Sequence, residues 1–234
     1  MKENSIERSN VIKEKELKRL YKSRDIEISN LWQRSVFLSV FLVLCFTGYG
    51  YLLMKMVESI PEDYENIKNV FSVFVVYNII AIFLALINVV FSVLWICMSK
   101  ASKAWYEVYE TAIKSFERDF KDQLGLDQNY LMGNRGLPSS KKDNCLFSGK
   151  SGAYSPSRIN IAIGQVSLII WIIVVIVHAI LICMFYSNMA WLSILSVVLC
   201  FIFMNISVCS KWIKSGILSK DTDADGYLAD EKEK

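Results

Sequence analysis

The stretch VFSVFVVYNIIAIFLALINVVFSVLWICM, residues 70–98, runs for 29 positions without a charged residue. A helix needs about 20 apolar residues to cross the hydrocarbon core of a bilayer. Three further stretches of 19, 25 and 20 residues are also uncharged: Val36–Met54, Ile161–Phe185 and Ala190–Cys209. The sequence therefore predicts an all-α, polytopic membrane protein with four transmembrane helices.

The composition excludes several other classes of protein. Of the 234 residues, 53% are hydrophobic, above the roughly 45–50% of soluble domains. This excess argues against a soluble enzyme, a secreted disulfide scaffold or a nucleic-acid-binding domain. The six cysteines follow no zinc or redox spacing, so we interpret them as reduced apolar side chains. Residues 1–35 are charged, and we expect no cleavable signal peptide.

The positive charges predict the orientation of the chain. Of the 26 lysines and arginines, 24 lie in residues 1–35, 99–160 and 210–234, whereas the segment between the first two spans holds only Lys55 and Lys68. Because cytoplasmic segments are enriched in these residues, we expect both termini and the middle segment to be cytoplasmic. The outer segments are short and leave little room for a binding or catalytic site.

The predicted organisation alternates membrane and cytoplasmic parts. Gly125 is the expected stop of the long second helix. The parts are a cytoplasmic N-terminal helix (1–35), transmembrane helices 1 and 2 (36–98), a cytoplasmic amphipathic helix continuing from the second span (99–124), an irregular cytoplasmic loop (125–157), transmembrane helices 3 and 4 (158–209) and an acidic cytoplasmic tail (210–234).

Both cytoplasmic helices carry one apolar stripe at spacings typical of a helix. The stripes comprise Leu17, Leu20, Tyr21, Ile28 and Leu31 in the first helix, and Trp105, Tyr109, Ala112, Phe116 and Phe120 in the second. They either pack on each other or on copies from neighbouring subunits, or they lie on the lipid surface. We favour helix packing, because both helices mix acidic with basic residues.

His178, the sole histidine, lies within the third uncharged stretch. An ionisable group in a membrane is a functional candidate, as a proton relay or a metal ligand. We favour a structural role, in which a neutral imidazole bonds to Ser196 or Ser193 at a similar depth on the adjacent antiparallel helix. The four spans contain no carboxylate, and this weakens any interpretation as a proton pump.

Four amide side chains are the other strong polar groups of the spans. Amides in lipid commonly bind helices together, and they also line water-filled paths. The sequence leaves both roles open for Asn78, Asn88, Gln165 and Asn205.

The tail contains the start of a calcium-loop pattern, at Asp221, Asp223 and Asp225. The pattern then fails, because position twelve is Lys232 where a calcium loop requires a bidentate glutamate. We therefore expect a solvated acidic tail and no metal. The sequence also lacks a nucleotide-binding glycine loop and a nucleophile–base pair, so we predict no catalytic residue, no cofactor and no enzyme.

Three short segments, taken together, resemble the RipA-type family of bacterial inner-membrane proteins, which are described as octameric. They are LWQRS (31–35), ASKAWYEVYE (101–110) and YSPSRIN (154–160), and the resemblance extends over roughly Ile26–Phe120 and from Tyr154 into the fourth span. It implies a homo-oligomer in the inner membrane, linked to bacterial fitness and host adaptation. Six residues of these motifs are expected at the inner interface: Trp32, Arg34, Lys103, Trp105, Tyr154 and Arg158.

Three functions are consistent with these features. The first is a structural or scaffolding oligomer whose partners are its own copies and membrane lipids, with no nucleic acid. The second is a ring-shaped pore, because the order of helices also looks like the SLATT-type effectors of bacterial conflict systems, which are thought to perforate membranes. The third, a small transporter, is disfavoured because the spans lack a buried charge and broken helices.

Overall fold

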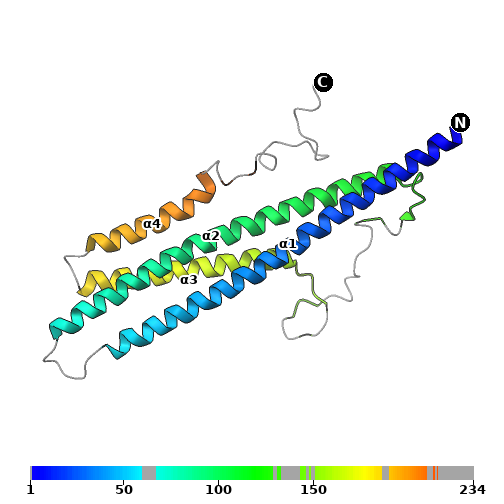
Figure 1. Cartoon of the computed structure of the whole chain (residues 1–234). Helices are drawn as coiled ribbons and strands as arrows, with labels where there is room; N and C mark the ends of the chain where they lie inside the picture. Colours follow the sequence, from blue (N-terminus) through cyan, green and yellow to red (C-terminus); the bar gives the residue numbers. More distant parts are fainter. Residues whose placement is uncertain are drawn as a thin grey trace. The chain divides into compact units, whose positions relative to one another are not determined.

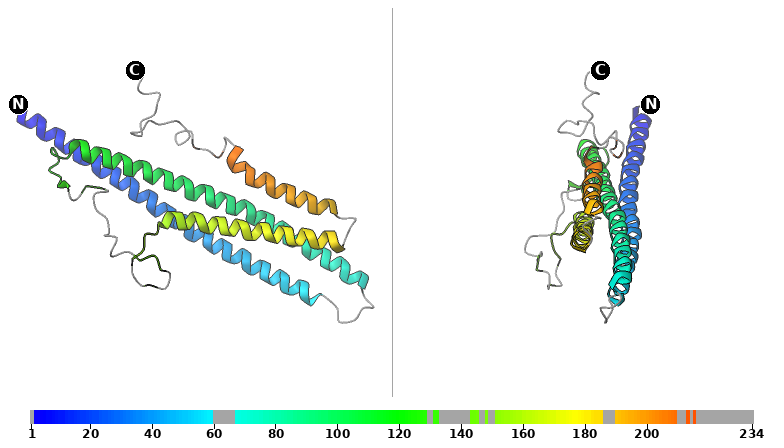
Figure 2. Two further views of the ribbon diagram at one scale, coloured as in Figure 1. Left: turned by 180° about the vertical axis from the view of Figure 1, so that it is seen from behind. Right: turned by 90° about the vertical axis from the view of Figure 1, so that its left-hand side faces the viewer.

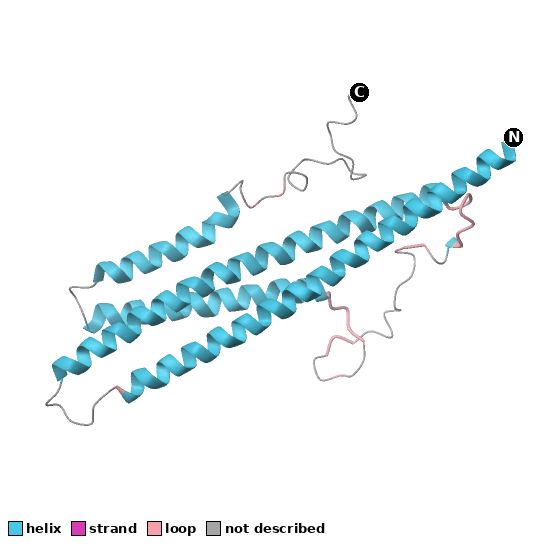
Figure 3. Ribbon diagram, viewed as in Figure 1, coloured by secondary structure: helices cyan, strands magenta, loops and turns pink. Residues whose placement is uncertain are grey.

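The computed structural model describes residues 2–59, 67–128, 131–132, 143–145, 148, 151–185, 190–209, 213 and 215. These residues form four helices and contain no strand (Figures 1 and 3). The helices are α1 (Lys2–Glu58), α2 (Ile67–Phe120), α3 (Pro156–Phe185) and α4 (Ala190–Cys209). The all-α prediction is confirmed.

Helices α1 and α2 are much longer than a bilayer is thick, with 57 and 54 residues (Figure 2). Neither contains a proline, so nothing interrupts the backbone hydrogen bonds at the predicted membrane boundary. In each helix the charged segment therefore continues into the uncharged stretch without a break.

Glycine and proline mark two helix boundaries. Helix α2 ends at Phe120, and Gly125 follows in a turn with φ of 60°, where the N–H of Leu126 donates to the carbonyl of Lys121 at 3.0 Å. Glycine adopts this left-handed conformation without a steric penalty. Helix α3 begins at Pro156, a favoured first position because proline lacks the N–H that would be unbonded there.

Three helices are long and apolar enough to cross a membrane, namely α1, α2 and α3. Helix α4 is 20 residues long, and its apolar part is described for Ala190–Asn205. Its full length matches the span that a bilayer requires. The structure is that of a polytopic helical membrane protein.

The chain divides into two compact units. One unit comprises Met1–Gln33, Ser99–Ile159 and Ser215–Lys234, and the other comprises Arg34–Met98 and Asn160–Lys214. The first holds the charged halves of α1 and α2, which the sequence predicts to be cytoplasmic, and the second holds the uncharged stretches. After this prediction we call them the cytoplasmic unit and the membrane unit.

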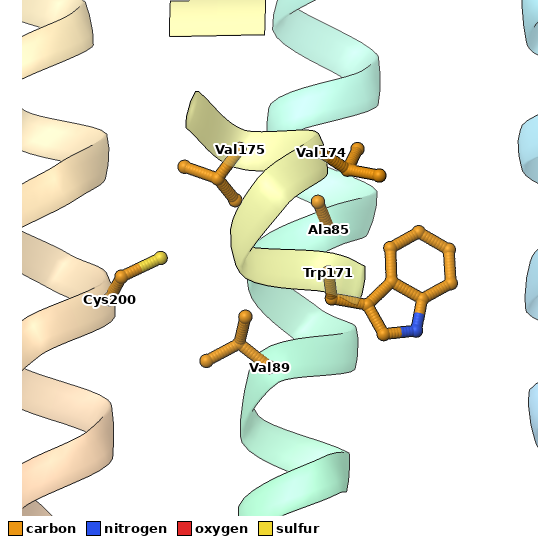
Figure 4. Close-up of a cluster of buried hydrophobic side chains, with 6 residues drawn as sticks. All are labelled: Ala85, Val89, Trp171, Val174, Val175 and Cys200. Atoms are coloured by element: carbon orange, nitrogen blue, oxygen red, sulfur yellow. The ribbon is translucent and has the colours of Figure 1, made fainter. Parts of the chain in front are cut away.

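The core of the membrane unit lies between α2, α3 and α4. Figure 4 shows Ala85 of α2 beside Trp171 and Val174 of α3, with Cys200 of α4 on one side and α1 at the opposite edge of the view. Six residues form this buried cluster: Ala85, Val89, Trp171, Val174, Val175 and Cys200. Helices α1 and α4 therefore flank the central pair, α2 and α3.

Buried side chains recur every seven residues on one face of α2, and all of them except Trp95 are small or polar. Two series of positions are buried: residues 78, 85, 92 and 99, and the residues three positions later, 81, 88, 95 and 102. The side chains are Asn78, Ala81, Ala85, Asn88, Ser92, Trp95, Ser99 and Ser102. Small residues allow membrane helices to approach closely. Gly164 of α3 lies against α2 and contributes a small residue to the same contact. A Cβ there would lie 2.9 Å from Cγ1 of Ile96.

Candidate functional site: a polar ladder between the membrane helices

Three side-chain hydrogen bonds join α2 to α3 at successive levels, and we call them the polar ladder. They connect Asn78 Oδ1 to His178 Nδ1 at 2.8 Å, Ser92 Oγ to Ser167 Oγ at 2.9 Å, and Trp95 Nε1 to Asn160 Oδ1 at 3.1 Å. Because the helices are antiparallel, residue numbers rise along α2 as they fall along α3. Bonds of this kind hold membrane helices in a defined register.

His178 is at the end of the ladder nearest the start of α2, and its side chain is 1% exposed. The amide nitrogen of Asn78 donates to the carbonyl of Phe74 at 2.8 Å, so the amide oxygen is the atom that faces the imidazole. Nδ1 of His178 must then carry the proton. Nε2 is left as an acceptor, and the hydroxyl of Tyr49 donates to it at 3.0 Å. The network therefore fixes one neutral tautomer.

The structure gives His178 different partners from the predicted serines. Ser193 donates to the carbonyl of Ala179 at 2.9 Å, and Ser196 donates to the carbonyl of Ser193 at 2.8 Å. Serine hydroxyls in helices readily bond to nearby backbone carbonyls. The imidazole instead bonds to α2 and α1, so one side chain links three helices.

Aromatic rings extend the contact between α1 and α3. Tyr49 packs edge-on against Trp171 with ring centres 5.7 Å apart, and Phe46 stacks on the same indole at 4.8 Å. Such pairs stabilise by about 0.5–1.5 kcal/mol beyond their buried area. Tyr49 thus contributes both its ring and its hydroxyl to the attachment of α1.

The four predicted amides divide into two pairs. Asn78 and Asn88 are buried within the protomer, where Asn88 donates to the carbonyl of Leu84 at 2.8 Å. Gln165 and Asn205 are exposed on the surface of the protomer, and Asn205 donates to the carbonyl of Phe201 at 2.8 Å. The first pair faces the interior of its own bundle, whereas the second pair is accessible to lipid, water or another subunit.

The cytoplasmic unit contains a second polar contact, which the sequence did not reveal. Glu117 is 3% exposed, and its carboxylate accepts hydrogen bonds from the hydroxyl of Tyr21 and from the backbone N–H of Met132, the latter at 2.6 Å. We call this contact the Glu117 clasp. Burial and the adjacent Glu117 carboxylate raise the pKa of Tyr21 to about 12. The clasp joins the N-terminal half of α1 and the C-terminal half of α2 to the segment after α2.

The predicted interfacial residues make local contacts. Lys103 pairs with Glu107 at 3.1 Å, Trp105 stacks on Tyr109 with ring centres 6.3 Å apart, and Tyr154 donates to the carbonyl of Asn144 at 2.5 Å. The exposed side chains of this set are Trp32, Arg34, Tyr154 and Arg158. Their placement at a membrane interface stays a prediction.

The calcium-loop pattern at Asp221, Asp223 and Asp225 lies outside the described residues. Among the residues that the structure describes, no group of three or more His, Cys, Asp or Glu side chains is placed to hold a metal ion.

The family model of the octameric membrane protein family (8xMP) matches residues 14–181. This range begins in the N-terminal half of α1 and includes the Glu117 clasp and the polar ladder. No curated protein and no solved structure gives a significant match. Because the family model covers more than half of the sequence, the chain belongs to the octameric membrane protein family.

Proposed function

We propose that the protein is a non-enzymatic scaffold of the bacterial inner membrane. Membership of its family makes it a homo-oligomeric membrane protein. The scaffold role is supported by one observation above the others: three pairs of polar side chains of the spans bond to one another between α2 and α3 inside each protomer. A ladder of this kind makes each protomer a rigid building block.

A catalytic role is disfavoured by the state of the sole histidine. Both ring nitrogens of His178 are engaged, by Asn78 and by Tyr49. A general base needs a free nitrogen within reach of a substrate proton. The spans also contain no carboxylate to share a proton with the imidazole.

A pore is the second candidate, and the exposed amides of Gln165 and Asn205 are the observation that favours it. A lumen needs polar side chains on the surface between protomers. The burial of Asn78 and Asn88 removes two of the four amides from such a surface. For this reason we favour the scaffold.

Ion flux from liposomes separates the two functions. The purified octamer is reconstituted into vesicles loaded with potassium, and efflux is compared for the wild type and Asn205→Leu. If the protein is a scaffold, potassium efflux should be as slow as from protein-free vesicles. Efflux in the wild type that Asn205→Leu abolishes would contradict the scaffold and establish the pore.

We also propose that both termini are cytoplasmic, as the distribution of positive charge indicates. Reporter fusions at either end, with one type active only in the cytoplasm and another only in the periplasm, test this orientation. Both ends should report the cytoplasm. We further expect a deletion strain to be outcompeted by its parent, in line with the fitness role that the resemblance implies.

A further inference from the structure

Gln165 and Asn205 lie at nearly the same depth on neighbouring helices. Ser193 of α4 donates to the carbonyl of Ala179 of α3, and this bond fixes the register of the antiparallel pair. Residue 165 is then level with residue 207, about two residues or ~3 Å from Asn205. Gln165 is seven residues, or about 10 Å, beyond Arg158 along α3, and lies within the predicted span.

Exposure of an amide to hydrocarbon is unfavourable. Each primary amide has two donor hydrogens and two acceptor lone pairs, more than the single bond from Asn205 to Phe201 satisfies. Transfer of such a group from water to an apolar phase without a hydrogen-bond partner costs several kcal/mol. We therefore expect the octamer to supply polar partners at this depth.

A groove lies on the same face, nearer the turn between α3 and α4. It has a volume of about 510 Å³ and apolar walls. Its lining includes Ile176, Ile180 and Met184 of α3, and Ser193, Ile194 and Val198 of α4. Gln165 shares this face of α3, because residues 165, 172, 176 and 183 follow each other at steps of seven and four. The groove and the amides of Gln165 and Asn205 together form one surface, which we call the α3/α4 face.

The membrane restricts how the copies in an octamer can meet. The inference rests on the orientation proposed above, in which every copy is inserted the same way. A two-fold axis in the plane of the membrane would invert a copy, so the symmetry axis must be normal to the membrane. Contacts in a ring of this kind join two different faces of the protomer. The α3/α4 face thus needs a partner elsewhere on the chain.

Helix α1 supplies the opposite face. Figure 4 places it across the core from α4, and only 6% of its most apolar 18 residues are buried in the protomer. Helix α1 is parallel to α3, and the bond between Tyr49 and His178 makes residues 49 and 178 level. Residue 36 is then level with Gln165, and residue 38 with Asn205. Ser39 lies at this depth with an exposed side chain.

We propose that the α3/α4 face of each protomer binds α1 of the next protomer, with Gln165 and Asn205 bonded at the level of Ser39. The serine hydroxyl donates to the carbonyl of Val36 at 2.8 Å, and its oxygen lone pairs accept an amide N–H. The apolar side chains of α1 beyond Ser39 then cover the groove. The interface is therefore heterologous and closes into a ring.

Cysteine cross-linking in native membranes tests the pairing. The double variant Ser39→Cys/Asn205→Cys should form a ladder of disulfide-linked oligomers under mild oxidation, since a disulfide requires Cα atoms within about 7 Å. Each single variant is a control for the native cysteines. The double variant Ser39→Cys/Ile194→Cys is a matched control, because Ile194 lies on the same face but is level with residue 49.

Two results would overturn the interface. One is the absence of disulfide-linked oligomers from the 39/205 double variant, although blue-native gels show an intact octamer and both termini are cytoplasmic. The other is a covalent dimer from Asn205→Cys alone, which would place copies of the same residue against each other. Termini on opposite sides of the membrane would instead contradict the proposed orientation.

A second variant tests the contribution of the amide. Asn205→Leu should weaken association roughly 3- to 15-fold per interface, the range expected for one hydrogen bond between membrane helices. Ile202→Leu, an apolar exchange at an exposed position of the same helix, should leave association unchanged. Equal octamer fractions for the wild type and both variants in a detergent titration would overturn the role of Asn205.

Discussion

Replacement of Tyr49 by phenylalanine removes one hydroxyl and leaves the ring that packs against Trp171. The hydroxyl donates to Nε2 of His178 at 3.0 Å, and the imidazole is 1% exposed. The variant therefore leaves a buried acceptor without its donor. Hydrogen bonds between membrane helices average about 0.6 kcal/mol and reach about 1.7 kcal/mol. Because the imidazole is buried, we expect a loss of about 1–1.5 kcal/mol.

The partner variant Asn78→Leu makes the prediction sharper. In the wild type Asn78 holds the proton on Nδ1 and so keeps Nε2 an acceptor for Tyr49. Without Asn78 the imidazole can carry its proton on Nε2, and Tyr49 can then accept instead of donate. Tyr49 then satisfies the N–H that Asn78 no longer accepts, so removal of its hydroxyl costs more in the Asn78→Leu background. The double variant should therefore be less stable than the sum of the two losses predicts, by about 0.5–1 kcal/mol, as for residues in one network.

Unfolding by sodium dodecyl sulfate, followed by far-ultraviolet circular dichroism in a fixed mixed micelle, measures these free energies. Tyr51→Phe on the same helix is the matched control, because Tyr51 is 63% exposed. Blue-native gels verify that all variants start from the same oligomer. A Tyr49→Phe variant as stable as Tyr51→Phe would refute the bond, and strict additivity with Asn78→Leu would refute the fixed tautomer.

Three further variants test other contacts. Gly164→Ala should lower stability by about 1–2 kcal/mol in the same assay, because the new Cβ would lie 2.9 Å from Cγ1 of Ile96, whereas Gly48→Ala meets open space and should not. Glu117→Gln should lower the melting temperature of the cytoplasmic unit and speed hydrogen exchange around Tyr21, since an amide cannot accept through both of its polar atoms; unchanged exchange would contradict the clasp. Tyr21→Phe should lose about 2 kcal/mol at neutral pH, the value of a hydrogen bond to a charged group. Because folding raises the pKa of Tyr21 to about 12, the stability from this bond is complete below pH 10 and is lost as the pH rises through 12, so the melting temperatures of wild type and variant should converge over that interval.

The helices could be predicted because each depends on a property of one segment. Absence of charge over 19 to 29 residues defines a span, and absence of proline lets α1 and α2 continue beyond their uncharged stretches. Ser155 and Pro156 likewise mark the start of α3. None of these features requires knowledge of which helices are neighbours.

The pairing of helices could not be predicted in this way. The predicted partners of His178, Ser193 and Ser196, lie on the helix next in sequence, whereas the structure pairs it with Asn78, a hundred residues earlier. The seven-residue repeat of small and polar side chains on α2 was the available signal. Glu117 resembled any solvated glutamate of an amphipathic helix, because burial of its carboxylate depends on Tyr21 and Met132.

A cryo-electron microscopy map of the octamer in lipid nanodiscs tests the central claim most directly, by showing where the polar side chains of the spans point. The account predicts His178 bonded to Asn78 and Tyr49 of its own protomer, with Ser92 on Ser167 and Asn160 on Trp95 below it. It also predicts that lipid or apolar side chains fill the axis of the ring. A water-filled axis lined by Asn78, Asn88 or His178 would contradict it.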